Sequence, residues 1–246
     1  MKRTRTVLVT GGAGGIGRGV AAAFAAAGDT VVIADRDAER VTGTARDLGV
    51  RGRVLDITDP ASITRELDAI AAESGPVEVL VNNAGLLTVH GTLLDLPGAD
   101  LDTILRTNVL GTFLMTQQVA RRMVDAGVAG AIVNISSIGG RQPTPGMGGY
   151  ESSKAAVDAL TRWAAIELAQ HGIRVNAVAP GPVLTEMMAA GMPEGSPQRR
   201  AWEDRIPLHR FASVEDVAAS AVFLAGEAAA HITGTSLPVD GGQLLT

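Results

Sequence analysis

The sequence predicts an α/β protein, in which one doubly wound parallel sheet carries helices on both faces. Three observations predict this fold. The short apolar runs are continuous rather than alternating, which is typical of strands buried on both faces. Longer segments with helical spacing separate these runs along almost the whole chain, as right-handed crossovers between parallel strands require. No linker or break in composition divides residues 1–246, so we expect a single domain.

Seven short runs are the expected strands. Each is mostly apolar and is punctuated by Gly, Asp or Asn, residues that favour turns. The predicted strands are Thr6–Thr10, Thr30–Asp35, Arg53–Ile57, Val77–Asn82, Ala131–Ser136, Ile173–Ala179 and Ser236–Val239.

Six Ala- and Leu-rich segments between these runs have helical spacing. The segment 185–212 interrupts the alternation and is rich in Met, Pro, Gly and Arg, with room for two short helices. Long excursions of this kind usually form lids or binding loops. The predicted helices are Ile16–Ala27, Ala38–Leu48, Pro60–Ser74, Asp100–Ala126, Tyr150–Gln170 and Val214–Ala225.

The composition excludes several classes of protein. A length of 246 residues with 46% hydrophobic residues supports a sizeable core and excludes disorder. The absence of cysteine excludes a disulfide framework, a thiolate metal site and a cysteine nucleophile. A net charge of −5 argues against binding to nucleic acid or an anionic membrane. Because no segment resembles a signal peptide or membrane span, we expect a cytoplasmic protein with a small-molecule partner.

The four histidines do not have the spacing of metal ligands. We therefore expect surface or loop positions for them and no metal site. They are His90, His171, His209 and His231.

A glycine-rich turn follows the first predicted strand and opens the first predicted helix. Glycines allow a tight turn and bring the backbone close to a pyrophosphate, whose charge then lies at a helix N-terminus. The run fits G-x-x-x-G-x-G on Gly11, Gly15 and Gly17, or G-x-G-x-x-G on Gly12, Gly14 and Gly17. No Lys-Ser/Thr pair follows, which excludes a Walker-type nucleotide loop. The order of strand, turn, helix and next strand favours a dinucleotide over a merely flexible turn.

The second predicted strand ends in Asp35, followed by Arg36. A carboxylate at this position accepts hydrogen bonds from the adenosine ribose hydroxyls and repels a 2′-phosphate, which favours NAD over NADP. Arg36 would pair with that phosphate if Asp35 turned away. The alternative interpretation is that Asp35 only caps the following helix.

Tyr150 is the only tyrosine, and Lys154 is the only lysine apart from Lys2, although arginine is frequent. In a helix, their four-residue spacing puts both side chains on one face. A chain that avoids both residue types elsewhere has placed them in one turn, which points to a joint chemical role. The alternative is that Tyr150 is a packed core aromatic with a satisfied hydroxyl.

Several motifs together resemble the short-chain dehydrogenase/reductase superfamily over about residues 6 to 242. Each motif alone is common, but their joint order and spacing are specific. The resemblance implies one Rossmann-type domain with a seven-stranded parallel sheet, and reversible hydride transfer between a nicotinamide and an alcohol or carbonyl carbon. The motifs are Thr10–Gly17, Asn82–Gly85, Asn108, Ser137, Tyr150–Lys154, Pro180–Gly181 with Val183 and Thr185, and Val239–Gly242.

Four residues are the expected catalytic set. Tyr150 would take the hydroxyl proton in oxidation and return it in reduction. A phenol with its usual pKa near 10 is too weak an acid to be a base at neutral pH, so Lys154 and the positive nicotinamide are expected to favour the phenolate. The resemblance adds that Lys154 holds the nicotinamide ribose. Ser137 would donate to the substrate oxygen, and we prefer it to Ser136 because its spacing to Tyr150 fits the family. Asn108 resembles the residue that holds a water linked to Lys154; alternatively, it satisfies a buried carbonyl.

The remaining cofactor contacts follow by position, near strand C-termini where ligands bind in such sheets. Asp56 and Ile57 resemble the pair that brackets the adenine, and Thr185 would hydrogen-bond the carboxamide. The expected cofactor residues are Gly11, Gly14, Gly15, Ile16, Gly17, Asp35, Arg36, Asp56, Ile57, Asn82, Ala84, Gly85, Tyr150, Lys154, Pro180, Gly181, Val183 and Thr185.

The segment 186–211 is the expected substrate cover, because its flexible apolar side chains could close on a hydrophobic substrate. The alternative is that it packs on its neighbours or on another subunit. The resemblance implies a homotetramer, or a homodimer, with interfaces on the helices that contain Asn108 and Tyr150 and on the C-terminal strand. The apolar side chains of the cover are Met187, Met188, Met192, Trp202 and Ile206.

Two other functions remain open on the sequence. One is an NADP-dependent carbonyl or 3-oxoacyl reductase, in which Arg36 reads the phosphate. The other is a non-catalytic NAD-binding regulatory protein, although such proteins typically lose the Tyr or Lys that this chain keeps.

Overall fold

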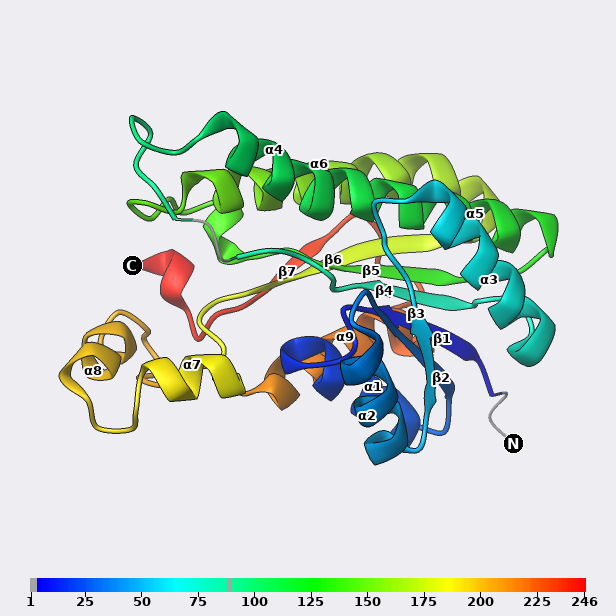
Figure 1. Ribbon diagram of the computed structural model, residues 1–246, viewed down its shortest axis with the longest axis horizontal. Coiled ribbons are helices and arrows are strands. Elements are labelled where there is room, and N and C mark those ends of the chain that lie inside the picture. Colours follow the sequence, from blue (N-terminus) through cyan, green and yellow to red (C-terminus); the bar gives the residue numbers. More distant parts are fainter. Residues whose placement is uncertain (1–3, 88–89) are drawn as a thin grey trace.

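The computed structural model describes residues 4–87 and 90–246 and confirms the predicted fold (Figure 1). Within these residues, seven strands form one parallel sheet in the order β3-β2-β1-β4-β5-β6-β7. The strands are β1 (Thr6–Thr10), β2 (Thr30–Asp35), β3 (Arg51–Val54), β4 (Val79–Asn82), β5 (Ala131–Ile135), β6 (Arg174–Pro180) and β7 (Ser236–Val239).

The strand order reverses at β1, which pairs with β2 on one side and with β4 on the other. The chain builds outward to β3 and then crosses over to β4, so the connections after β1 and β4 leave in opposite directions. Thr10 and Asn82 lie in register at the C-terminal ends of these two strands. Crevices at such reversal points are where open α/β sheets bind ligands.

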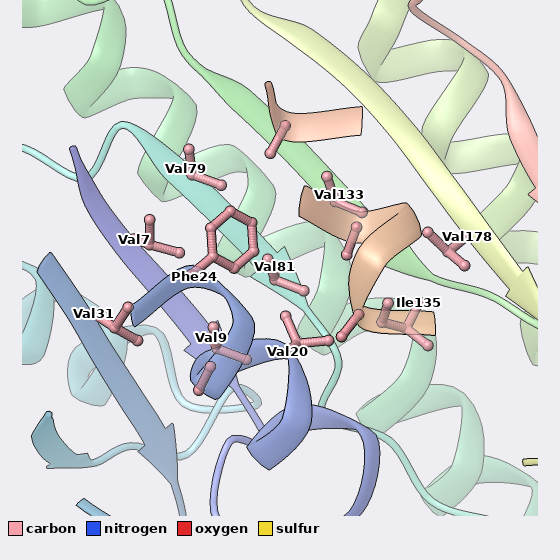
Figure 2. Packing of buried hydrophobic residues seen from close by; sticks show 14 of the residues in the cluster. Val7, Val9, Val20, Phe24, Val31, Val79, Val81, Val133, Ile135 and Val178 are labelled. Atoms are coloured by element: carbon pink, nitrogen blue, oxygen red, sulfur yellow. The ribbon is translucent and has the colours of Figure 1, made fainter. Parts of the chain in front are cut away.

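Helices cover both faces of the sheet (Figure 1). One apolar layer packs side chains of β1 against helices α1 and α9, with Val7, Val9 and Phe24 fully buried (Figure 2). The other layer contains Leu8, which alternation along β1 points to the opposite face. The first layer is covered by α1 (Gly15–Ala26), α2 (Ala38–Leu48) and α9 (Val214–Ala225), and the second by α3 (Pro60–Ser74), α5 (Thr112–Asp125) and α6 (Gly148–Leu168).

The predicted continuous helix over 100–126 is wrong in one respect. The structure has α4 (Gly98–Leu105), then a π-helical segment, η1 (Arg106–Gly111), and then α5. Gly111 lies so close to Ile57 that a Cβ there would be 2.6 Å from the Ile57 Cδ1 atom. The wider π turn brings the Asn108 side chain inside, where it is 1% exposed.

The third predicted strand is displaced toward the N-terminus: it runs over Arg51–Val54 instead of Arg53–Ile57. The Asp56 carboxylate accepts hydrogen bonds from the Thr58 backbone N–H at 2.8 Å and from the Thr58 hydroxyl at 2.7 Å. This local turn of the backbone stops the strand.

The interrupting segment contains the two short helices predicted for it, α7 (Glu186–Gly191) and α8 (Pro197–Glu203). A single bridge between Val183 and Ala212 closes its base. Both helices lie beyond the C-terminal ends of the strands (Figure 1). All four histidines are exposed, as predicted. No helix in residues 4–87 and 90–246 is long and apolar enough to cross a bilayer.

Candidate active site

The glycine turn after β1 is fixed by close backbone contacts. Gly11 has a φ of +61° and Gly15 a φ of +51°, a region that favours glycine. A Cβ on Gly17 would overlap the Gly11 carbonyl oxygen and the Asn83 side-chain amide. The geometry therefore favours the reading of the turn as G-x-x-x-G-x-G on Gly11, Gly15 and Gly17.

The other glycines of the turn pack against β2 and α2. A Cβ on Gly12 would lie 2.8 Å from the Ile33 Cβ atom, and one on Gly14 would overlap the Arg40 guanidinium. Gly14 is the N-cap of α1 and provides no side-chain cap, so the backbone of Gly15 and Ile16 begins the helix without a side-chain acceptor. A helix start of this kind suits an anion.

The end of β4 approaches the same turn through Asn83, which was not among the predicted site residues. Its side-chain amide donates to the carbonyls of Thr10 at 3.1 Å and Gly11 at 2.9 Å. The Thr10 hydroxyl in turn accepts from the backbone N–H groups of Asn83 and Ala84. These bonds hold Ala84 and the following Gly85 beside the glycine turn.

The predicted contact residue Asn82 directs its side chain elsewhere. Its amide donates to Thr116 at 3.0 Å and to Asn134 at 2.9 Å, inside the layer between the sheet and α5. Strand alternation could have indicated this, because Asn82 shares a face with Leu80, which lies in that layer.

Asp35 lies at the end of β2 as predicted, and it does not cap α2. Asp37 is the N-cap, and its carboxylate accepts from the Arg40 backbone N–H at 3.1 Å. Asp35 is half-buried, and Arg36 is exposed beside it. The Arg40 guanidinium, which no sequence pattern singled out, lies against Gly14 of the turn. The end of β2 thus offers one carboxylate and two guanidinium groups.

The segment after β6 approaches the glycine turn. The Gly181 backbone N–H donates to the Val239 carbonyl at 3.0 Å, while Val183 is buried. The Thr185 hydroxyl accepts from the Met188 backbone N–H at 3.3 Å and so caps α7, and its methyl group approaches Gly15. The predicted adenine-side pair, Asp56 and Ile57, follows β3.

The predicted acid/base residues come together at the start of α6. The Lys154 Nζ atom lies 5.6 Å from the centroid of the Tyr150 ring. Tyr150 also forms a hydrogen bond with the side chain of Ser137, at the end of β5. Lys154, on the same helix, and Ser137, just after β5, thus both lie beside the Tyr150 side chain.

The structure differs from the expectation that Lys154 lowers the pKa of Tyr150. Burial raises the pKa of the phenol above its usual value, the hydrogen bond with Ser137 lowers it, and the negative charge of Glu151 raises it. Lys154 is itself buried, and its Nζ donates to the Ile135 carbonyl at 2.7 Å. Burial is the largest of the effects on the phenol.

Burial also lowers the pKa of Lys154 to about 8, while the carboxylate of Asp158 one turn later opposes this shift. An ammonium group with a pKa near neutrality can take up or release a proton within the pH range of enzyme action. Lys154 therefore combines a fixed position with a proton that is held weakly.

The structure separates the two adjacent serines. The Ser136 hydroxyl is buried and donates to the Lys154 carbonyl at 3.2 Å, which ties β5 to α6. The Ser137 hydroxyl accepts from the Gly139 backbone N–H at 3.1 Å and lies beside Tyr150. Of the two, Ser137 is the one that the structure brings to the phenol.

Asn108 lies behind this group and uses its side chain for structural bonds. Its amide donates to the Leu86 carbonyl at 3.0 Å and to the Ser153 hydroxyl at 2.9 Å, and its oxygen accepts from the Leu86 N–H at 2.7 Å. Its oxygen and the Lys154 Nζ atom both crowd Gly85, where a Cβ would lie 3.2 Å and 3.7 Å from them. The side chain thus makes the carbonyl contact that the sequence left open as the alternative.

The predicted cover stands at the mouth of the crevice with part of its apolar surface exposed. Met187 is 77% exposed, whereas Ile206 at the far end is buried. The loop before α4 carries Leu93 and Leu94, which are also exposed. Apolar side chains therefore border the open side of the site.

Comparison with known proteins agrees with this geometry. The family model described as enoyl-(acyl carrier protein) reductase matches residues 11–243. The chain is 39% identical to D-threitol dehydrogenase of Mycolicibacterium smegmatis, over 98% of this chain and 93% of that protein. It is 37% identical to 3-oxoacyl-(acyl-carrier-protein) reductase of Thermotoga maritima, over 98% of each.

Solved structures give the same result. A short-chain type dehydrogenase/reductase from Mycobacterium ulcerans superposes with a TM-score of 0.94 at 36% identity, covering 100% of this chain and 92% of that one. ElxO with NADP bound has a TM-score of 0.93 at 34% identity, covering 99% and 100%. A 3-ketoacyl-(acyl-carrier-protein) reductase from Brucella melitensis complexed with NADH has a TM-score of 0.90 at 32% identity, covering 97% and 98%.

Proposed function

We propose that this chain, which belongs to the short-chain dehydrogenase/reductase superfamily, uses Tyr150 to oxidise a secondary alcohol with NAD and to reduce the corresponding ketone. Members of this superfamily are oxidoreductases that act on alcohols and ketones with a nicotinamide cofactor. The observation that carries the proposal is the convergence of Tyr150, Lys154 and Ser137 at one crevice. A scaffold protein would have no need of a buried ammonium beside this phenol.

The crevice fits the dinucleotide on its own geometry. A Cβ on Gly15 would meet only the Thr185 methyl group, at 3.7 Å, so the turn leaves room beside the uncapped start of α1. We assign the pyrophosphate to this helix start and the adenosine ribose to Asp35. When bound, the nicotinamide accepts the hydride from the alcohol carbon or returns it to the ketone.

The residues of the chain handle the proton and the developing charge. In oxidation, the O–H bond of the alcohol breaks and its proton passes to the Tyr150 oxygen; in reduction, the phenol returns it. The Ser137 hydroxyl donates to the substrate oxygen as negative charge develops there. Lys154 would hold the nicotinamide ribose, and its ammonium group, with a pKa of about 8, lies beside the phenol ring. Asn108 positions Gly85 and Ser153 around Lys154.

The test of this function is turnover by Tyr150→Phe, compared with the wild-type protein on both oxidised cofactors and a panel of secondary alcohols that includes D-threitol. We expect a loss of turnover of about 10³-fold or more, with cofactor affinity retained, because the phenyl ring keeps its packing but cannot carry a proton. Substantial residual turnover would show that the base is another group. Binding of NAD without turnover of any substrate by the wild type would favour the regulatory protein.

We propose NAD as the preferred cofactor because Asp35 would repel a 2′-phosphate. Arg36, together with Arg40 against Gly14, is the observation that favours the second candidate, an NADP-dependent carbonyl or 3-oxoacyl reductase. Asp35→Ala should raise the affinity for NADP relative to NAD by about 10-fold, and titration of cofactor fluorescence measures it. An unchanged ratio would remove Asp35 from the assignment.

We also propose that the chain forms a homotetramer or homodimer through the outer face of α5 and α6. There, Trp163 is 50% and Ile166 is 80% exposed, and Trp163 stacks on Phe113 with ring centroids 5.9 Å apart. A groove of about 400 Å³ runs beside them. Sedimentation velocity of Ile166→Asp should show smaller particles; an unchanged sedimentation coefficient would place the interface elsewhere.

A further inference from the structure

Asp158 is a buried acid on α6 that the proposed mechanism does not use. It lies one helical turn after Lys154 and is 5% exposed. One carboxylate oxygen accepts a hydrogen bond from the Ser236 hydroxyl at 2.8 Å, and the other lies 3.4 Å from the Arg141 Nε atom. A carboxylate that leaves water loses its hydration, and only good partners compensate for that loss. The two partners come from two other elements of the fold, so the acid joins three segments at one point.

Arg141 completes this cluster. It directly follows η2 (Ile138–Gly140), the turn that begins at Ser137, and its guanidinium also donates to the Ser236 carbonyl at 2.9 Å. Ser236 is the first residue of β7. Arg141, Asp158 and Ser236 therefore form a clasp, in which each residue contacts the other two across η2, α6 and β7.

The turn η2 lies along α6 before it reaches the clasp. A Cβ on Gly139 would lie 3.0 Å from the Glu151 Cγ atom, and one on Gly140 would lie 2.8 Å from the Ala155 backbone nitrogen. Residues 151, 155 and 158 follow one another at about one helical turn, so they share one face of α6. The turn therefore follows this face until it reaches Asp158.

The near end of the turn holds Ser137, and the far end is held by the clasp. The Gly139 backbone N–H donates to the Ser137 hydroxyl at 3.1 Å, and the Gly140 backbone N–H donates to the Ser137 carbonyl at 3.1 Å. The loop after the turn has a second attachment to α6, because the Thr144 backbone N–H donates to Glu151 at 2.8 Å. Loss of the clasp should therefore loosen the turn without releasing it.

Ser137 and Tyr150 come from different elements, so their spacing depends on how the turn is fixed to α6. A hydroxyl that donates to a developing oxyanion must be held to within about 0.5 Å of its productive position. A buried ion pair is a weak source of stability, because the loss of hydration offsets the attraction between the charges. The clasp instead supplies a fixed geometry between the two residues that meet the substrate oxygen.

We propose that Asp158 is a positioning residue of the reaction: with its two clasp partners it holds the Ser137 turn against the helix that carries Tyr150, so that both hydroxyls meet the same substrate oxygen. The inference rests on the proposed function. It predicts that breaking the clasp lowers kcat and leaves cofactor affinity unchanged, because the glycine turn follows β1 and is attached to β4 instead.

The experiment is a double-mutant cycle of Asp158→Asn and Arg141→Met, measured by kcat per folded protein and by hydrogen exchange of the Ser137 turn. Each single change breaks the same contact, so each should lower kcat by about 10-fold, and the double variant should also lose about 10-fold instead of about 100-fold. Amide exchange in residues 137–147 should become faster by about 10-fold in all three variants. Arg141→Lys keeps a cation in the clasp and should recover part of kcat.

The cycle separates positioning from charge. The Asp158 carboxylate also opposes the lowering of the Lys154 pKa, an effect that Asp158→Asn removes. Arg141→Met leaves this carboxylate in place. A fall of kcat in Asp158→Asn without a fall in Arg141→Met would therefore assign the effect to charge on Lys154 and overturn the proposal.

The matched control is Asp29→Asn, which breaks another buried pair of an aspartate with an arginine. Asp29 is 8% exposed, lies 2.7 Å from Arg5 and precedes the first residue of β2, at the sheet edge opposite the strand C-termini. This variant should be less stable but should keep kcat and the exchange of the turn. An equal fall of kcat in the control, or unchanged exchange in the clasp variants, would overturn the proposal. Because hydrogen exchange requires no turnover, a fully active Tyr150→Phe would refute the proposed function separately.

Discussion

The two walls of the crevice are built in opposite ways. The glycine-turn wall, residues 10–17 and 82–85, is held by backbone contacts that leave no room for a single methyl group at Gly11 or Gly17. The lid wall, residues 186–211, presents Met187 to solvent at 77% exposure, and its far end is attached to the body through the buried Ile206 and a backbone hydrogen bond from Leu208 to Gly241. One wall is complete within the chain, whereas the other has apolar surface with nothing covering it among the described residues.

On the glycine-turn wall the backbone geometry determines the residue type, whereas on the lid wall the residue type can vary with the ligand that is bound. A position at which only glycine fits is fixed whatever the substrate, and the proposed cofactor is the same for many reactions. An exposed methionine can adapt to substrates of different shape. Variants should therefore affect stability and cofactor binding on the first wall, and substrate use on the second.

The largest effect is expected for Gly17→Ala. The added Cβ would overlap the Gly11 carbonyl and the Asn83 amide, so the turn must move. We expect cofactor affinity to fall by about 100-fold or more and the free energy of unfolding to fall by about 3 kcal/mol. Fluorescence titration with the dinucleotide and urea unfolding measure the two quantities.

The control is Gly28→Ala, at a glycine with a φ of +86° where an added Cβ would meet no other atom within 4 Å. Backbone strain alone should cost about 1 kcal/mol there and leave cofactor affinity unchanged. If Gly17→Ala bound the cofactor as the wild type does, the contacts of the glycine-turn wall would not be what shapes the site.

The sequence predicted the sheet well because parallel strands buried on both faces leave continuous apolar runs. It could not predict the π turn, because the apolar spacing of 100–126 continues through it and only the contact between Gly111 and Ile57 shows where the helix widens. Asp56 ended β3 early for a local reason, a turn that its own side chain makes.

Within the site, the residues identified from motifs converged, but the motifs did not show which of their side chains face the site. Asn82 and Asn83 are the same residue type, and only the alternation of β4 separates the side chain that faces the helices from the one that meets the turn. Arg40 reaches the glycine turn from α2, whose sequence gives no sign of it. The sign of the Tyr150 pKa shift depended on burial, which spacing does not reveal.

A smaller effect is expected for Lys154→Met, which tests the cost of the ammonium group buried behind the glycine-turn wall. In the wild type, the fall in the Lys154 pKa from 10.5 to about 8 lowers the free energy of unfolding by about 3 kcal/mol, a cost that the variant avoids. The variant also loses the hydrogen bond to Ile135, which lowers its own free energy of unfolding by about 1 kcal/mol. At pH 7 the variant should therefore be more stable by about 2 kcal/mol, although inactive.

The pH dependence of the stability difference between Lys154→Met and the wild type tests the sign of this effect. The folded protein releases the Lys154 proton at a lower pH than the unfolded chain does, so the cost is present in full below pH 8 and disappears as pH rises to 10.5. Urea unfolding across this range should show the advantage of Lys154→Met shrinking with rising pH. A constant difference between the two proteins would mean that Lys154 does not lose its proton on folding at these pH values.

The smallest effect on stability, and the sharpest contrast between the walls, is expected for Met187→Ser on the lid wall. Because Met187 is 77% exposed, its replacement should change the unfolding free energy by less than about 0.5 kcal/mol, whereas Met115→Ala in the core, at 0% exposure, should cost about 2–5 kcal/mol.

If the lid closes on substrate, Met187→Ser should raise KM for an apolar secondary alcohol by about 3-fold, the value of part of one buried side chain, and leave cofactor affinity unchanged. If the lid instead packs on another subunit, the dissociation constant of the oligomer should change while KM does not. An unchanged KM with an altered sedimentation profile would therefore assign the exposed methionine to assembly. The two walls would then differ in what covers them: a ligand would cover the glycine-turn wall, and a second copy of the chain would cover the lid wall.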